Sequence, residues 1–271
     1  MSFIKTPLQK AETAIVQADA VLIGAGAGLS TAAGINYSGP DFEKAFADMI
    51  ARYGFTDLYT SSFYPFQSEE EKWAYWSRHI DYARFAPGGK PLYRHLLEMV
   101  QGKEYFVITT NVDGQFAKSG FDPDKVFEVQ GDYGLMQCAT ACHPKRYSNE
   151  SLVKQMVAEQ QDCRIPSSLV PRCPVCGGPM EINVRKDRYF VEDDRWHQQA
   201  ERYYAFLEAT LGKKKLVLLE YGVGFNTPTI IRFPFERMAA AYPDVTLIRI
   251  NKDYRECQTP GIRHFIGLES I

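Results

Sequence analysis

The sequence predicts an α/β fold: a Rossmann-like, doubly wound parallel sheet with a smaller lobe attached to it. Three observations support this prediction. Strand-like and helical segments alternate through most of the 271 residues, which favours a mostly parallel sheet with flanking helices. A glycine-rich turn, Gly24 to Gly28, follows the first predicted strand. Two segments, 38–85 and 135–186, do not fit the alternation, and we interpret them as insertions that form the small lobe.

The elements of the predicted sheet follow one another in order. Thr6 and Pro7 are typical of an N-cap and a first helical residue, so a helix should run from there toward Ala18. A second helix is expected from Asp194 to Leu211, with apolar side chains at helical spacing and Gly212 to end it. The predicted strands are residues 20–23, 105–109, 126–129, 216–220 and 245–250.

The two insertions differ in character. Segment 38–85 is aromatic and mostly helical, with Trp73, Trp76 and Ile80 on one face, whereas segment 135–186 has weak periodicity. We therefore divide the chain into a main domain, made of residues 1–37, 86–134 and 187–271, and a small lobe made of a helical insertion (38–85) and a cysteine-containing module (135–186).

Composition excludes several classes of protein. A net charge of −2 gives no overall attraction to nucleic acid or to an anionic membrane. The longest apolar runs, such as residues 216–219, are too short to cross a bilayer. Residues 1–10 lack the apolar core and cleavage site of a signal peptide. We expect a cytoplasmic protein with no nucleic-acid or membrane partner.

Four of the six cysteines form close pairs, Cys138 with Cys142 and Cys173 with Cys176. Close pairs in an intracellular chain favour a metal over disulfides, and four thiolates suit a structural zinc ion. Reduced cysteines without a ligand are the alternative. The other two, Cys163 and Cys257, are interpreted as small buried residues.

The glycine-rich turn has two interpretations. Glycines between a strand and a helix let the backbone approach a pyrophosphate, whose charge then faces the helix N-terminus. Tight turns also use glycine without any ligand, and Gly28 is not followed by a glycine at the usual third position. From this segment alone, dinucleotide binding and a plain turn are about equally supported.

Further motifs follow in the order found in sirtuins, and the sequence resembles that family from Gly24 to Asn251. Its cysteine pairs also stand where sirtuins carry a zinc module. The matching motifs are Gly26-Ala27-Gly28-Leu29-Ser30, Gly34-Ile35, Pro40-Asp41-Phe42, Thr110-Asn111-Val112-Asp113, Gly222-Val223-Gly224 and Ile250-Asn251.

The resemblance implies NAD as co-substrate and a role for each matched residue. It places Gly26, Ala27 and Ser30 at the phosphates, Ile35 and Asp113 at the nicotinamide amide, Asp41 near the nicotinamide ribose, Asn111 at the base of that pocket, Gly222 and Gly224 on the adenosine side, and Asn251 at the adenine ribose. Without the resemblance, Asn111 and Asp113 would be interpreted as turn residues and Asn251 as the cap of a following helix.

Three departures from the usual sirtuin pattern affect the chemistry. Residues 36–39 separate Gly34-Ile35 from Pro40-Asp41-Phe42, and Glu43 replaces an arginine. The loop 222–228 is one residue shorter and lacks a hydroxyl pair, for which Asn226 is a candidate substitute. Gln130 stands where deacylating sirtuins have a histidine, and an amide cannot act as a general base.

This combination resembles the macrodomain-linked, class M sirtuins of microbes. The resemblance implies protein mono-ADP-ribosyltransferase activity, a lipoylated glycine-cleavage H-like carrier protein as acceptor, an oxidative-stress setting and a functional link to a macrodomain hydrolase. Asn111, Asp113 and Gln130 are the candidate catalytic residues, with Gln130 also holding the ribose. Two alternatives are a lysine deacylase with another base, which Gln130 disfavours, and a non-catalytic NAD or ADP-ribose sensor, which Asn111 and Asp113 disfavour.

Overall fold

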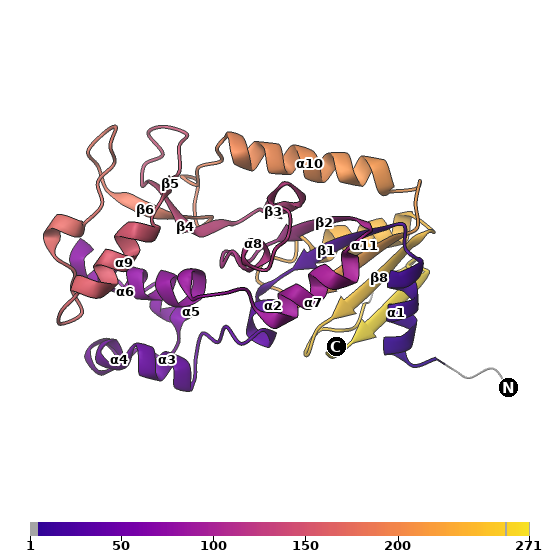
Figure 1. Ribbon diagram of the computed structural model, residues 1–271, viewed down its shortest axis with the longest axis horizontal. Helices are drawn as coiled ribbons and strands as arrows, with labels where there is room; N and C mark the ends of the chain where they lie inside the picture. Colours follow the sequence, from indigo (N-terminus) through magenta and orange to yellow (C-terminus); the bar gives the residue numbers. More distant parts are fainter. Residues whose placement is uncertain (1–4, 258, 271) are drawn as a thin grey trace.

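The computed structural model describes residues 5–257 and 259–270. Residues 1–4 lie outside the described residues; they begin the segment that was expected to lack a signal peptide. Residues 258 and 271 of the predicted main domain also lie outside them. Two lobes lie side by side (Figure 1): a parallel sheet with its helices, and a smaller lobe that carries α3 to α6, α9 and a second sheet.

The main sheet has six parallel strands in the order β3-β2-β1-β7-β8-β9. The strands are β1 (Ala20–Ala25), β2 (Glu104–Thr109), β3 (Val126–Glu128), β7 (Leu216–Tyr221), β8 (Val245–Ile250) and β9 (His264–Leu268). The order in which strands are added reverses at β1: β2 and β3 lie on one side of it, and β7, β8 and β9 lie on the other. This is the doubly wound arrangement expected from the sequence, and ligands of such sheets bind beyond the carboxyl ends of the strands at the reversal.

Helices cover both faces of this sheet, as the side chains of β1 require. Val21 and Ile23 pack in one apolar core with α1 (Pro7–Gln17), α7 (Pro91–Val100) and α8 (Gln115–Lys118). Ala20 and Leu22 point to the other face and pack with α10 (Asp194–Thr210) and α11 (Arg232–Ala241). The strand is buried throughout because alternate side chains enter two separate cores.

The predicted helix ends and strands agree with the structure to within one or two residues. Thr6 caps α1 by accepting a hydrogen bond from the Gln9 backbone N–H, and the Gln9 side chain accepts one from the Thr6 backbone N–H. Strand β9 was not predicted from the sequence, because its side chains are mostly half-buried and an irregular loop precedes it.

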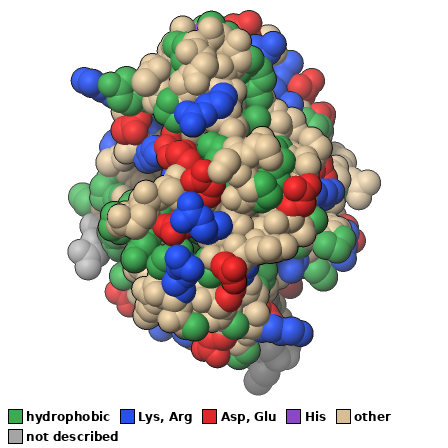
Figure 2. Space-filling view, turned by 90° about the vertical axis from the view of Figure 1, so that its left-hand side faces the viewer, with side chains coloured by type: hydrophobic (Ala, Val, Ile, Leu, Met, Phe, Trp, Pro, Cys, Tyr) green, Lys and Arg blue, Asp and Glu red, His purple; other side chains and the backbone are tan. Residues whose placement is uncertain are grey.

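The small lobe has its own core, built from aromatic and apolar side chains of both insertions. Its helices are α3 (Pro40–Ala45), α4 (Ala47–Tyr53), α5 (Leu58–Ser61), α6 (Glu69–Ile80) and α9 (Glu150–Glu159), with a π-helical turn at Asp81–Phe85. Lys, Arg, Asp and Glu side chains are interspersed on the face of the molecule seen in Figure 2, without a large patch of one sign.

A second, antiparallel sheet lies in the cysteine module, in the order β5-β4-β6. Its strands are β4 (Gly131–Cys138), β5 (Tyr147–Ser148) and β6 (Met180–Val184), none of which the weak periodicity of this segment predicted. Strand β4 crosses the predicted boundary between residues 134 and 135, and the division into domains stays a prediction. Throughout the described chain, no helix has both the length and the apolar character needed to span a membrane.

Candidate functional site

Two adjoining cavities lie at the carboxyl ends of β1, β2, β7 and β8, beside the reversal of the sheet. The larger has a volume of about 690 Å³ and lies between the turn from β1 to α2 (Ala27–Ala32) and the loops after β7 and β8. The smaller has a volume of about 180 Å³ and lies above the end of β2. Ala27, Thr31 and Thr110 line both, so the two cavities are neighbours.

Glycines allow the two loops beside the larger cavity to pack backbone against backbone. The Gly28 N–H donates to the Gly222 carbonyl at 2.9 Å, and Gly222 has a φ of +64°. A Cβ on Gly222 would lie 2.3 Å from the Leu29 nitrogen, and one on Gly26 would lie 2.8 Å from the Gly222 carbonyl oxygen. Because side chains cannot fit at these contacts, glycine is required at both positions. A Cβ on Gly224, by contrast, would meet open space.

The larger cavity contains most of the residues predicted on the phosphate and adenosine sides. Those residues are Gly26, Ala27, Gly222, Gly224, Asn226 and Asn251. The Asn251 amide donates to the Val223 carbonyl at 3.0 Å, and its oxygen accepts from the backbone N–H groups of Asp253 and Tyr254. Asn251 therefore holds the first turn of the loop after β8 and links this loop to the loop after β7. The helix that it was alternatively predicted to cap does not form in residues 252–257.

A buried polar network forms the wall of the smaller cavity. Asn111 Nδ2 donates to the Gly26 carbonyl and to Ser30 Oγ, at 3.0 Å each, and lies 3.3 Å from the Tyr93 hydroxyl. Ser30 Oγ in turn donates to Asp113 Oδ2, and Asp113 Oδ1 accepts from the Gln115 backbone N–H at 3.1 Å. Ile35 completes the predicted set at this cavity. The network fixes the orientation of two of the three candidate catalytic residues, Asn111 and Asp113.

Opposing influences act on the ionisation of Asp113. Burial raises the pKa of its carboxyl, and the hydrogen bond from Ser30 opposes that rise. Burial also raises the pKa of the Tyr93 hydroxyl, so this group acts only as a neutral hydrogen-bonding partner. The side-chain oxygen of Asn111, Oδ1, accepts no hydrogen bond from any of the described residues (5–257 and 259–270). It therefore remains available as an acceptor for a ligand.

Sequence reasoning did not identify three tyrosines at this site. Tyr93 belongs to α7 and is fully buried, while Tyr37 and Tyr133 line the smaller cavity. Beside them, Arg84 makes two hydrogen bonds to Asp132, at 2.7 and 3.1 Å. Tyrosine is common in cores, so only the long-range pairing of Tyr93 with Ser30, at 2.9 Å, gives it a functional context, and no motif in the sequence indicates that pairing.

Two predicted residues lie apart from the cavities. Asp41 is exposed in the first turn of α3, where it lines neither cavity. Gln130 is half-buried between β3 and β4, and its backbone carbonyl accepts from the Arg185 N–H at 2.9 Å. Nearby, burial raises the pKa of Glu128 to about 8, and the charge of Asp132 contributes to that rise. The roles of Asp41 and Gln130 in binding or catalysis stay predictions.

The four paired cysteines come together at one end of the small lobe. Their sulfurs lie within 4.8 Å of one another, with Cys138 to Cys176 and Cys142 to Cys173 at 3.7 Å each. Four sulfurs around zinc at its usual bond length stand about 3.8 Å apart, so this donor set fits the ion. Cys163 is buried as predicted, whereas the prediction for Cys257 was wrong: it is half-buried, because it lies in the irregular loop after β8.

Comparison with known proteins identifies relatives of one family over most of the chain. The model of the Sir2 family matches residues 26–212. A protein of Staphylococcus aureus named protein ADP-ribosyltransferase is 42% identical over 241 residues, covering 89% of this chain and 76% of that protein. A probable bifunctional ADP-ribose hydrolase/ADP-ribosyltransferase of Fusarium oxysporum is 34% identical over 244 residues; the match covers 86% of this chain but only 40% of that protein.

Solved structures show the same fold. A Sir2 protein with a p53 peptide and NAD+ has a TM-score of 0.54 and 17% sequence identity, and the match covers 97% of this chain and 92% of that one. At this identity the likeness concerns the fold alone.

Proposed function

Because this chain belongs to the Sir2 family, we propose that it cleaves nicotinamide from NAD and transfers the ADP-ribosyl group to an acceptor protein. One observation carries the proposal: Asn111 and Asp113 are held by buried hydrogen bonds at the smaller cavity, while Gln130 stands where deacylases need a base. The names of two relatives, from Staphylococcus aureus and Fusarium oxysporum, support the transferase assignment.

Binding would use both cavities. The larger cavity, of about 690 Å³, would take the adenosine and phosphates, with Gly26, Ala27 and Gly222 allowing close approach of the backbone. The smaller, of about 180 Å³, would take nicotinamide, with Asp113 and the Ile35 backbone holding its amide. Asp41 and Asn226 would contact the ribose and adenosine sides as the loops close on the ligand.

The chemical step breaks the bond between the nicotinamide nitrogen and the ribose C1′, and nicotinamide leaves with the bonding electron pair. Positive charge then develops on the ribose. Asn111 Oδ1 accepts no hydrogen bond from the described residues, and the amide hydrogens of the same side chain already bind Gly26 and Ser30. We propose that this fixed dipole stabilises the developing charge without reorganisation. A nucleophilic atom of the acceptor side chain then forms the new bond to C1′.

Gln130 limits which acceptors can react. An amide cannot take a proton near neutral pH, so a nucleophile that needs deprotonation would react slowly. A carboxylate is already ionised and needs no base. Gln130 can still orient the ribose or the acceptor through hydrogen bonds.

We propose a lipoylated, glycine-cleavage H-like carrier protein as acceptor, with an ADP-ribose hydrolase acting on the product. The fusion of hydrolase and transferase in the name of the Fusarium oxysporum relative supports this functional link. The test is to incubate the chain with labelled NAD and the carrier, with and without its lipoyl group. Label on the lipoylated carrier alone supports the proposed acceptor. Equal labelling of both forms removes the lipoyl requirement, and no labelling removes the carrier.

We propose that Cys138, Cys142, Cys173 and Cys176 bind a structural zinc ion. Protein purified without chelator should contain about one zinc per chain, and Cys163→Ser is the matched control that should leave this content unchanged. Metal-free protein with four freely reactive thiols would contradict the site. Reduced thiols persist mainly in the cytoplasm, which is the location we propose.

A further inference from the structure

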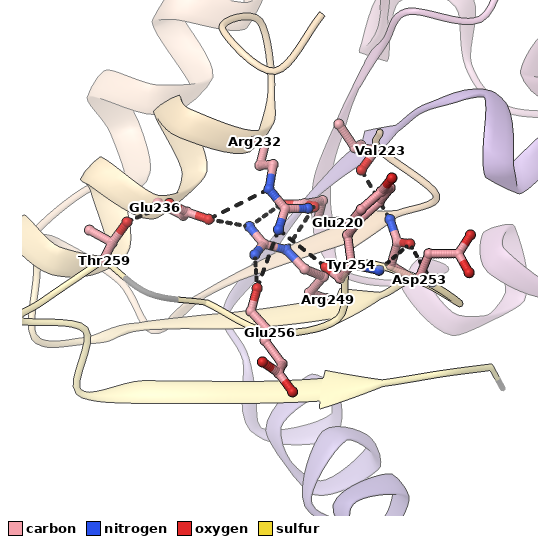
Figure 3. A network of polar contacts seen from close by, with 10 residues as sticks. Glu220, Val223, Arg232, Glu236, Arg249, Asp253, Tyr254, Glu256 and Thr259 are labelled. Atoms are coloured by element: carbon pink, nitrogen blue, oxygen red, sulfur yellow. Dashed lines mark hydrogen bonds and ion pairs between the residues drawn. The ribbon is translucent and has the colours of Figure 1, made fainter. Parts of the chain in front are cut away.

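Two arginines and two glutamates form a buried polar network (Figure 3). Two of them, Arg232 and Glu236, line a further cavity that shares Phe225 and Tyr254 with the larger cavity of the site. Arg249 of β8 and Glu220 of β7 face each other in the sheet and are fully buried. Arg249 donates to both carboxylate oxygens of Glu220, at 2.8 and 2.9 Å, and to Glu236 of α11 at 2.7 Å. Arg232, also of α11 and 5% exposed, lies 3.5 Å from Glu220.

Stability alone does not explain this group. Apolar side chains of the same volume often serve a core as well as buried ion pairs do, because ions lose their hydration. The arginines have further partners, however, that apolar side chains could not bind. Arg232 Nη2 donates to the backbone carbonyls of Tyr254 and Glu256, at 3.1 and 3.2 Å, and Arg249 Nη1 donates to the Glu256 carbonyl at 2.7 Å.

These carbonyls belong to the loop after β8, which has no regular hydrogen-bond ladder between residues 251 and 257. Lys252, Asp253 and Tyr254 of this loop line the larger cavity. Irregular backbone needs hydrogen-bonding partners to keep one conformation, and the guanidinium groups supply them here. Asn251 fixes the start of the loop, and the arginines fix its middle.

Arg232 also contacts the loop on the other side of the cavity. Its guanidinium lies over the Phe225 ring, 4.5 Å from the centroid, and Phe225 meets Tyr254 edge to face at 4.9 Å. Phe225 and Tyr254 both line the cavity. One buried side chain thus connects the β7–α11 loop to the loop after β8.

We propose that Arg232 is a positioning residue for the adenosine half of NAD: it holds the two loops at the spacing that this half requires. The inference rests on the proposed function, because it takes the larger cavity as the adenosine subsite. It predicts a change in affinity rather than in chemistry, since the Asn111 network belongs to the other cavity.

The experiment compares Arg232→Gln with Arg255→Gln in the full chain. Arg255 is exposed in the same loop and pairs only with Glu269 among the described acidic residues, so it controls for the lost charge. Arg232→Gln should weaken ADP-ribose binding in calorimetry and raise KM for NAD by about tenfold, with kcat at saturating NAD within about twofold of wild type. Inhibition by nicotinamide should not change, and Arg255→Gln should resemble wild type.

Arg232→Lys is the second variant, in case glutamine prevents folding. It keeps the charge beside Glu220, but a lysine cannot bridge both carbonyls and stack on Phe225, so ADP-ribose binding should again weaken. Unchanged ADP-ribose binding in a folded Arg232 variant would overturn the inference, as would a parallel loss of nicotinamide inhibition. A wild-type chain that binds ADP-ribose but transfers nothing would contradict the proposed function and leave this inference standing. Absence of ADP-ribose binding by wild type would overturn both.

Discussion

The two cavities of the site are built in different ways. Buried side chains from α2, α7 and the end of β2 form the wall of the smaller one, where Ser30, Tyr93, Asn111 and Asp113 bind one another. The larger one is enclosed by loops, whose positions depend on glycine contacts and on hydrogen bonds to backbone carbonyls. Under the proposed function, this difference predicts that the side-chain network acts in bond cleavage and that the loops act in recognition of the rest of the ligand.

The largest expected effect comes from the smaller cavity. Asn111→Ala should reduce ADP-ribosyl transfer by about 10²-fold or more, because it removes a fixed dipole from the reacting ribose. NAD binding should fall less than turnover. Steady-state kinetics and calorimetry on the same preparation measure both, with circular dichroism to establish folding. Turnover equal to wild type in the folded variant would remove Asn111 from the catalytic residues.

Substitutions in the larger cavity should affect binding, and two glycines of one loop offer a matched pair. Gly222→Ala places a Cβ against the Leu29 backbone at a positive φ, so it should destabilise the fold by about 1–3 kcal/mol and weaken ADP-ribose binding. Gly224→Ala adds the same methyl group in open space and should change both quantities little. Thermal melting and calorimetry provide the measurements. Equal effects of the two changes would contradict the close packing of the loops.

Asp113→Asn should separate stability from activity. Burial raises the pKa of Asp113 in the folded protein, so the folded protein holds a proton on this carboxyl more tightly than the unfolded chain does. The stability it contributes is therefore fully present below the ordinary aspartate pKa and is lost as pH rises through the raised value. The variant should melt above wild type by an amount that grows with pH and vanishes in acid, while transfer falls. A melting difference that shrinks as pH rises would refute this sign.

The smallest effect is expected from restoring a histidine. Gln130→His should give little deacylation, because residues 36–43 and the loop 222–228 also differ from deacylating sirtuins. Gln130→Ala should reduce transfer by removing a group that orients the ribose. Acetyl-lysine peptide assays of both variants test this. Strong deacylation by Gln130→His would show that one side chain separates the two activities.

Local patterns predicted much of the fold and part of the site. The buried strands and α10 follow from apolar periodicity, and Thr6-Pro7 marks the start of α1, because these signals lie within a few neighbouring residues. The Asn111 and Asp113 network joins residues more than 80 positions apart, and its partner Tyr93 has no local signal. The resemblance to sirtuins supplied the first two residues but not the tyrosine.

Local patterns also fail to reveal the long-range contacts that hold the loops of the larger cavity. Asn251 was predicted at the site, yet Arg232, Glu236 and Arg249 were not, since a charged residue in a helix or strand usually faces solvent. Here the sheet register places Glu220 opposite Arg249, and α11 covers the pair. Burial of this kind depends on tertiary packing, which the periodicity of single segments does not contain.

We propose that NAD cleavage by this chain leads to transfer rather than deacylation. The most direct test follows three products in one reaction of wild-type chain with NAD, a lipoylated carrier protein and an acetyl-lysine peptide. Nicotinamide, ADP-ribosylated carrier and deacetylated peptide are each counted over time. We predict that nicotinamide release matches carrier modification while the peptide stays acetylated. Loss of acetyl groups in step with nicotinamide, with the carrier unmodified, would contradict the transferase assignment and establish the deacylase alternative.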